Sequence, residues 1–174
     1  TNGKFSLNDF HKKPIIADAD TIFSTHFGCF VVSKAGQKGL YDAEGKCMLP
    51  ITFNNISFDN SRYWLVNKDG KQGLYSHMGK EILPPRYDSI EVACSFCTTA
   101  SNYFIVKKGL YGLCNKEGKF IVDPQYTAIK YRYLRYFKLT KGDSCHYLFN
   151  YKDIIKDITL DDAMPITIQR NEQK

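Results

Sequence analysis

The chain has 174 residues and carries 24 lysines and arginines against 18 aspartates and glutamates, which gives a formal charge of +6. This length suffices for one domain with its own core or for a short array of repeats. No apolar run approaches the ~20 residues of a membrane-spanning helix, so no membrane span is expected. The aromatic content of 14% favours strands over helices.

Residues 1–29 contain no complete copy of the pattern that dominates the rest of the chain. Gly3-Lys4-Phe5 and Pro14-Ile15-Ile16 resemble the second half of that pattern, and terminal repeats are often atypical because one face meets water. We therefore expect a partial capping unit here. The chain begins at Thr1 rather than at methionine, which is compatible with removal of a signal peptide and equally with a domain of a longer protein. The sequence leaves the compartment open, and we favour export to a cell envelope over the cytoplasm.

One pattern recurs with a period of about 35 residues, which is typical of repeat architectures. Its clearest copy, Trp64–Val92, alternates short apolar runs with polar turns at Gly70 and Gly79. Each copy predicts three or four short antiparallel strands, which cannot bury a hydrophobic face alone. Pro84 and Pro85 are expected to end a strand because they lack backbone donors. The repeats are predicted at residues 30–62, 63–102 and 103–135, with a degenerate unit and a tail at residues 136–174.

Two sets of residues hold equivalent places in the three repeats. Phe30, Trp64 and Tyr103 open the first apolar run of each repeat, and we expect them at matching, mostly buried positions. Glycine recurs inside a later run, where no turn is expected, and this indicates a β-bulge or a backbone lying close over the strand. These glycines are Gly39, Gly73 and Gly112. Together the patterns predict an all-β protein, an array of antiparallel hairpin or meander repeats that is twisted or barrel-like.

The densest mixture of positive charge and aromatic rings lies at residues 130–138. Alternation along one strand would put Lys130, Arg132 and Lys138 on one face and the rings on the other. The rings in question are Tyr131, Tyr133 and Phe137. Such a pattern predicts rings in the core and charges in water.

The chain beyond this stretch aligns as a degenerate fourth unit over Tyr136–Tyr151. In that alignment Gly142 takes the place of Gly70, and Cys145 takes the place of Gly73. The second half of the unit cannot be recognised.

The repeated series is glycine-leucine-tyrosine, then glycine-lysine, then proline, with tyrosine or phenylalanine and isoleucine at its end, and it is clearest at Lys71–Ile90. It resembles the bacterial WG-containing repeat, also called the KWG repeat, over residues 30–129. The tryptophan that precedes glycine in that family is replaced by Lys38, Gln72 and Tyr111. The resemblance implies a repeated β-structure, often in arrays, without a general catalytic activity.

The residues that could carry chemistry do not form a recognised constellation. Cys94 and Cys97 have the spacing of half a zinc site or of a thiol redox pair, but a second pair and a βαβ context are missing. We expect bridged or free loop thiols there. The four histidines are scattered, and no nucleophile elbow or glycine-rich phosphate loop occurs. We therefore assign no catalytic residue, no metal and no cofactor; a hydrolytic or redox enzyme is the last alternative.

The sequence favours a non-catalytic binding or scaffold module that engages a protein or a cell-envelope polymer. Tyr41 and Tyr75 recur once per repeat and, if exposed, would form a ladder of shallow sites for protein or sugar rings. The same tyrosines would serve equally well as packing between repeats.

Two neighbouring stretches are expected to frame the interaction surface. Residues 93–102 are an insertion between repeats, and such insertions often lie on the binding face; this one contains Phe96. The basic stretch contributes Lys130, Arg132 and Arg135. The alternative function is nucleic-acid binding by residues 130–138, although rings and charges on opposite faces argue against it.

Overall fold

The computed structural model describes residues 3–59, 62–93, 103–132, 136–151 and 154–158. The chain divides into two compact units, Thr1–Ile90 (unit 1) and Glu91–Lys174 (unit 2). Within the described residues the secondary structure is almost entirely β-strand, interrupted by one short 3-10 turn, η1 (His26–Gly28). The all-β prediction is therefore confirmed.

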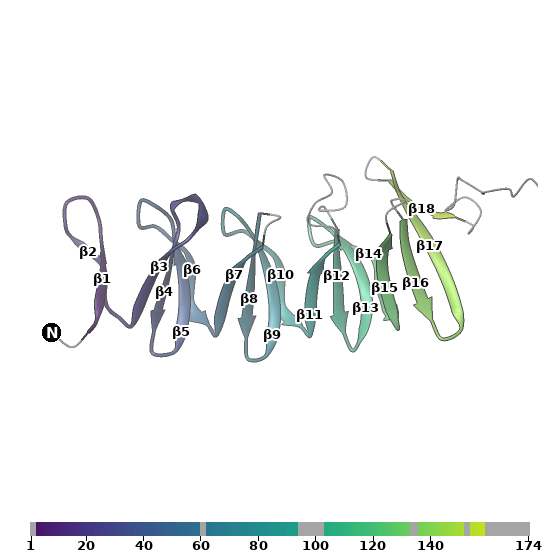
Figure 1. The fold of residues 1–174 in the computed structure, drawn as a ribbon, viewed down its shortest axis with the longest axis horizontal. Coiled ribbons are helices and arrows are strands. Elements are labelled where there is room, and N and C mark those ends of the chain that lie inside the picture. The colour runs from purple at the N-terminus through teal and green to yellow at the C-terminus, as the bar shows by residue number, and fades with distance from the viewer. Residues whose placement is uncertain (1–2, 60–61, 94–102, 133–135, 152–153, 159–174) are drawn as a thin grey trace, which may run out of the picture. The chain divides into compact units, whose positions relative to one another are not determined.

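Unit 1 contains a two-stranded hairpin followed by four-stranded antiparallel sheets (Figure 1). The hairpin consists of β1 (Phe5–Asn8) and β2 (Pro14–Ala19). The first sheet contains β3 (Thr21–Ser24), β4 (Phe30–Lys34), β5 (Gln37–Tyr41) and β6 (Cys47–Phe53). The second sheet contains β7 (Asn55–Phe58), β8 (Tyr63–Lys68), β9 (Lys71–Ser76) and β10 (Glu81–Tyr87).

The boundary between the units falls within β11, and the remaining strands belong to unit 2. The third sheet contains β11 (Ser89–Val92), β12 (Tyr103–Lys108), β13 (Leu110–Asn115) and β14 (Phe120–Tyr126). The fourth sheet contains β15 (Ala128–Arg132), β16 (Tyr136–Lys141), β17 (Ser144–Tyr151) and β18 (Ile154–Ile158). Each of these sheets pairs strands in chain order as an open meander, so the predicted meander is confirmed and the barrel-like form is wrong.

A single residue joins each sheet to the next. Asn54 separates β6 from β7, and Thr127 separates β14 from β15. The backbone N–H of each junction residue donates a 2.8 Å hydrogen bond to the second strand of the new sheet, at Asn67 and Thr140 respectively. The last short strand of each predicted repeat is therefore the first strand of a new sheet, as β7 pairs with β8.

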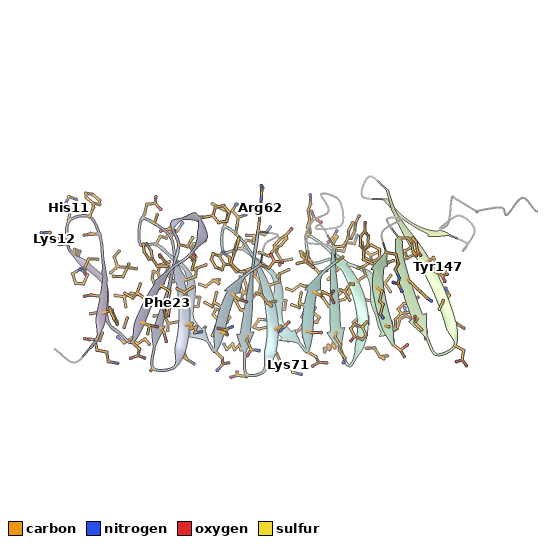
Figure 2. All side chains as sticks on the ribbon, viewed as in Figure 1. His11, Lys12, Phe23, Arg62, Lys71 and Tyr147 are labelled. Atoms are coloured by element: carbon orange, nitrogen blue, oxygen red, sulfur yellow. The ribbon has the colours of Figure 1, made fainter. Side chains whose placement is uncertain are left out.

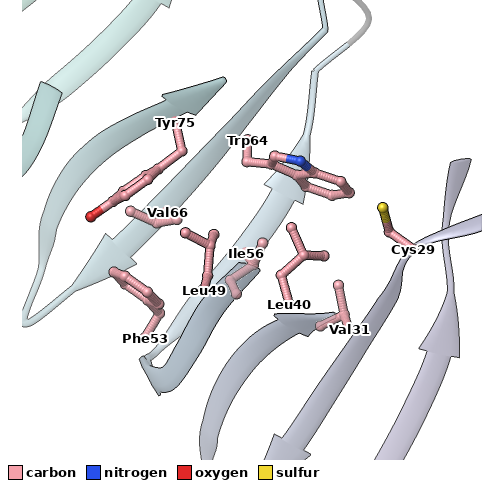
Figure 3. Close-up of a cluster of buried hydrophobic side chains, with 9 residues drawn as sticks. All are labelled: Cys29, Val31, Leu40, Leu49, Phe53, Ile56, Trp64, Val66 and Tyr75. Carbon is pink, nitrogen blue, oxygen red and sulfur yellow. The ribbon is translucent and has the colours of Figure 1, made fainter. Parts of the chain in front are cut away.

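Sheets within a unit bury each other's faces. In unit 1 the first sheet supplies Leu40 and Phe53 to a core that the second sheet completes with Trp64 and Val66 (Figure 3). Trp64 is 1% exposed, and its indole N–H donates to the carbonyl of His77 at 3.3 Å. The corresponding core of unit 2 contains Ile105 and Leu113 from the third sheet with Ile129, Phe137 and Leu139 from the fourth. Small sheets of this kind are stable because a neighbour covers each apolar face.

The mid-strand glycines lie where the fourth strand of a sheet bulges over the third. A Cβ atom added to Gly73 would lie 2.8 Å from the backbone nitrogen of Pro85, and one added to Gly112 would lie 2.8 Å from the carbonyl oxygen of Val122. Gly39 is crowded in the same way by Leu49 and Ile51. The ladder shifts register at each place, so the predicted bulge and close backbone approach are confirmed.

The prolines take part in this bulge instead of ending the strand. Strand β10 continues through Pro84 and Pro85 to Tyr87, which pairs with Gln72. Proline lacks an N–H, and a bulge is one of the few places in a sheet where a donor is not needed. The prediction that these prolines stop the strand is wrong for that reason.

The fourth sheet differs because a larger residue replaces the glycine. His146 lies opposite Leu139, as Gly73 lies opposite Val66, so His146 holds the glycine position. Strands β17 and β18 pair without a register shift from Tyr147 to Tyr151. The predicted alignment, which placed Cys145 on Gly73, is therefore wrong by one residue, and the bulge is absent where glycine is absent.

A shorter turn in the third sheet changes which of its aromatic residues corresponds to Trp64. Trp64 lies opposite Tyr75, and Phe30 lies opposite Tyr41, as expected for equivalent residues. In the third sheet, however, only Gly109 separates the paired Lys108 and Leu110, whereas two residues separate the last pair in the earlier hairpins. Phe104 therefore pairs opposite Cys114 and takes the place of Trp64, and the prediction that Tyr103 does so is wrong.

Tyr41 and Tyr75 are buried, each with 9% of its surface exposed, so of the two interpretations of their recurrence the ladder of exposed rings does not hold. The Tyr75 hydroxyl donates a 2.8 Å hydrogen bond to Glu81, while Tyr41 lies opposite Cys47. Burial, with the Cys47 thiol as a secondary cause, raises the pKa of Tyr41 to about 12. Burial and then the Glu81 carboxylate raise the pKa of Tyr75. Both rings serve as packing, which was the other reading of their recurrence.

Replacing Gly73 with alanine tests the crowding at the bulge. The new methyl group would meet backbone atoms that cannot move independently, so we expect the free energy of unfolding to fall by about 2–3 kcal/mol. Urea denaturation followed by Trp64 fluorescence measures the change. Gly70→Asn is the matched control, because no atom lies within 4 Å of a Cβ there and asparagine tolerates its positive φ; it should cost about 1 kcal/mol or less. Equal midpoints for Gly73→Ala and the wild type would contradict the bulge account.

The buried tyrosines predict a loss of stability in alkali. An unfolded tyrosine ionises near pH ~10, whereas folding raises the pKa of Tyr41 to about 12 and also raises that of Tyr75. The unfolded chain therefore releases these protons first, and stability present below pH ~10 declines as the pH rises towards ~12. Over this pH interval the free energy of unfolding of a Tyr41→Phe/Tyr75→Phe variant should fall by about 1 kcal/mol less than that of the wild type. Parallel pH profiles of unfolding free energy for variant and wild type would contradict this assignment.

Candidate binding surface

The basic stretch of the sequence forms two strands of the fourth sheet rather than one. Lys130 on β15 lies directly opposite Lys138 on β16, and Arg132 lies opposite Tyr136. Lys130 and Arg132 are exposed, whereas Lys138 is half-buried. The three cations therefore share one face of the sheet, as predicted from their alternation. Arg135 lies outside the described residues, so its predicted role stays a prediction.

The opposite face of the same strands is the inner, core-facing one. Phe137 is fully buried there, and Tyr131 packs against the same cluster with a ring separation of 5.2 Å from Phe137. The predicted separation of these rings from the cations is confirmed for the described residues. Tyr133 lies outside them.

Two tyrosines that the sequence reasoning did not assign lie on the same face as the cations. Tyr136 pairs with Arg132 on the neighbouring strand. Tyr147 on β17, labelled in Figure 2, pairs with Lys138. Their rings are 5.7 Å apart in an edge-to-face arrangement. We call Lys130, Arg132, Tyr136, Lys138 and Tyr147 the basic–aromatic face. Cations and these two aromatic rings therefore share one face of the sheet.

The basic–aromatic face replaces an apolar one. The pair Lys138–Tyr147 occupies the register position that holds two aliphatic residues in each of the other four-stranded sheets. Those pairs are Val31–Leu40, Leu65–Leu74 and Ile105–Leu113. A lysine and a tyrosine keep apolar stems but end in polar groups, so this face is suited to water or to a polar partner.

A shallow groove of about 400 Å³ runs beside β15 in unit 2. Lys130 and Arg132 line it together with Glu91, Ala93 and Tyr111. The Lys107 ammonium lies 5.3 Å from the centroid of the Tyr111 ring. Ala93 is the first residue of the predicted insertion; Phe96 and the rest of that loop lie outside the described residues, and a protein contact there stays a prediction.

The described residues include no group of three or more histidine, cysteine, aspartate or glutamate side chains placed to hold a metal ion. Cys94 and Cys97 fall outside that part of the chain. Burial raises the pKa of Cys114 to about 12, which leaves it a neutral thiol near pH 7. In the same described residues, no helix is long and apolar enough to cross a membrane.

The residue that precedes each mid-strand glycine reaches the first strand of the following sheet. The Lys38 ammonium donates to the Asn55 side chain at 2.7 Å, and the Gln72 side chain accepts the backbone N–H of Ile90 at 2.7 Å. Tyr111 packs on the core of unit 2. Lys38 and Gln72 therefore connect consecutive sheets by hydrogen bonds, whereas Tyr111 contributes its ring to the core.

Comparison with known proteins identifies the repeats. The family model described as the WG containing repeat matches residues 73–93 and residues 111–133. Each match begins at or next to a mid-strand glycine, continues through the bulged strand and ends around the first strand of the following sheet. No curated protein matches the chain. Over these two segments the chain is similar to the WG-containing repeat, as its sequence predicted.

Proposed function

We propose that the chain is a non-catalytic binding module that holds an anionic polymer on the basic–aromatic face of its fourth sheet. The observation that carries this proposal is the position of Tyr136 and Tyr147 on the same side as Lys130, Arg132 and Lys138. Cations and rings on one surface are the combination with which proteins hold the backbone and the bases of single strands.

The arrangement of the cations favours a bound anion. Lys130 and Lys138 lie directly opposite each other in neighbouring strands, where like charges destabilise a sheet. Among the residues whose side chains are described, β15, β16 and β17 also place Ala128, Thr140 and Cys145 on this side, and none of these is a carboxylate. Glu91 lines the groove beside Lys130 and Arg132. A phosphate or carboxylate held between the two ammonium groups would relieve the repulsion.

The rings favour a polymer with flat or apolar units between its charges. Tyr136 and Tyr147 are half-buried and form an edge-to-face pair, so the ring faces are held in place before a ligand arrives. Single-stranded nucleic acid would use both the cations and the rings. An acidic cell-envelope polysaccharide would use the cations and place sugar rings on the tyrosines.

Charge reversal of the facing lysines tests the proposal. Lys130→Glu/Lys138→Glu should weaken binding to an oligothymidylate at least tenfold and should lower the slope of log affinity against log salt by about one to two, because two phosphate contacts are lost. Fluorescence anisotropy across a salt series measures both quantities. Lys108→Glu/Lys119→Glu changes the net charge equally at exposed lysines outside the face, and it should retain most of the affinity. Equal losses in the two variants, or no binding of any polyanion at low salt, would overturn the proposal.

Removing the rings distinguishes the two polymers. Tyr136→Leu/Tyr147→Leu keeps the charge and should weaken oligothymidylate binding about tenfold, because stacking on aromatic rings is worth ~1–3 kcal/mol per base. Heparin, which carries charge without bases, should lose less than about twofold. The same loss for both ligands would assign the polysaccharide rather than nucleic acid.

A further inference from the structure

A second constellation lies in unit 1, in a groove of about 520 Å³. Cys29, directly before β4, lines it together with Cys47 and Met48 on β6 and Trp64 of the second sheet. The turn after β9 adds His77 and Met78. The groove therefore gathers two thiols, two thioethers and an imidazole around the one tryptophan of the chain.

The sulfur atoms of Cys29 and Met48 converge. They lie 3.9 Å apart, and Cys29 is 6% exposed at the Trp64 end of the core in Figure 3. Two sulfur ligands of one first-row metal ion, with bonds of ~2.3 Å at a trigonal angle, lie ~4 Å apart. The pair is thus spaced for a shared ion without movement of the backbone.

A third sulfur lies on the neighbouring turn. Gly79 packs on Met48, since a Cβ added to Gly79 would lie 3.1 Å from the Met48 carbonyl oxygen. Met78 precedes Gly79, lines the same groove and is 73% exposed. Its flexible side chain can therefore turn towards the Cys29–Met48 pair at little cost.

The surroundings suit a soft, weakly hydrated cation. Asp42 and Glu44 line the groove against one lining ammonium, that of Lys46. The two carboxylates favour a bound cation. The rings of Phe27, Phe58 and Trp64 follow one another at 5.5 and 4.6 Å and screen one side of the groove.

We propose that this groove binds one soft monovalent metal ion, Cu(I), through the sulfur atoms of Cys29 and Met48, with Met78 as the third ligand. Thiolate and thioether ligands together select Cu(I) over the harder divalent ions. The ion replaces the thiol proton of Cys29, which is released to solvent, and the oxidation state of copper does not change.

The test uses Ag(I), which is soft and monovalent and needs no reductant, with Trp64 emission as a local reporter. The starting protein carries Cys47→Ser, Cys94→Ser, Cys97→Ser and Cys145→Ser, which leaves the buried Cys29 and Cys114. One equivalent of Ag(I) should quench most of the emission, and Cu(I) under anaerobic conditions should do the same. Zn(II) at equal concentration should change it little.

Variants of the ligands complete the experiment. Met48→Leu and Met78→Leu keep the volume and remove only sulfur, so each should fold and raise the dissociation constant for Ag(I) about tenfold. Cys29→Ser should abolish the quenching, whereas Cys114→Ala, which removes the other buried thiol, should leave it unchanged. Unchanged emission with Ag(I), binding in Met48→Leu equal to the starting protein, or equal responses to Zn(II) and Ag(I) would overturn the proposal.

Discussion

The close passage of one strand over a glycine is the constraint on which the three bulged sheets depend. At Gly39, Gly73 and Gly112 the backbone of the following strand occupies the space that a Cβ would need. The bulge bends the fourth strand, after which a single residue leads into the next sheet. The proline-containing strand and the glycine are complementary, since one lacks a donor and the other lacks a side chain. His146 marks the opposite case, in which a side chain is present and the ladder continues straight.

The proposed function depends on the difference between the two faces of the fourth sheet. Aliphatic pairs such as Val31–Leu40 and Ile105–Leu113 make one face of a sheet apolar. A neighbouring sheet covers that face, because apolar surface is unfavourable in water. The fourth sheet keeps Phe137 and Leu139 on the face that it buries but carries Lys138 and Tyr147 where aliphatic residues would stand. Repeat proteins need polar surfaces of this kind where stacking stops. Lys130, Arg132 and Lys138 concentrate positive charge on this face, while Glu91 lines the adjoining groove.

Much of the architecture could be predicted from the sequence because it depends on local signals. The recurring glycines and hydrophobic runs gave the all-β meander, and the position of Gly73 inside a run indicated the bulge. The sheet boundaries could not be predicted, because Asn54 and Thr127 resemble ordinary turn residues and their hydrogen bonds connect residues distant in sequence. The place of Phe104 depends on the turn at Gly109, where one missing residue moves every side chain of the strand to the other face.

The alternation of side chains along a strand also explains which residues of the candidate surface were missed. Residues 130–138 were treated as one strand, but they form parts of two strands, in which Lys130 pairs with Lys138. Tyr147 joins the same face from a third strand. Tyr41 and Tyr75 could be recognised as equivalent from the sequence, but their burial depends on the neighbouring sheets. A signal for Tyr136 was present, since it is two residues from Lys138 and therefore shares its face.

The most direct measurement of the central claim is a nitrogen-15 NMR titration of the whole chain with an oligothymidylate at low salt. The account predicts that amide shifts concentrate on Lys130, Arg132, Tyr136, Lys138 and Tyr147 and their strand neighbours, and that they reverse when salt is added. Shifts concentrated in unit 1, or no shifts with either the oligonucleotide or heparin, would contradict the assignment of this face as the binding surface.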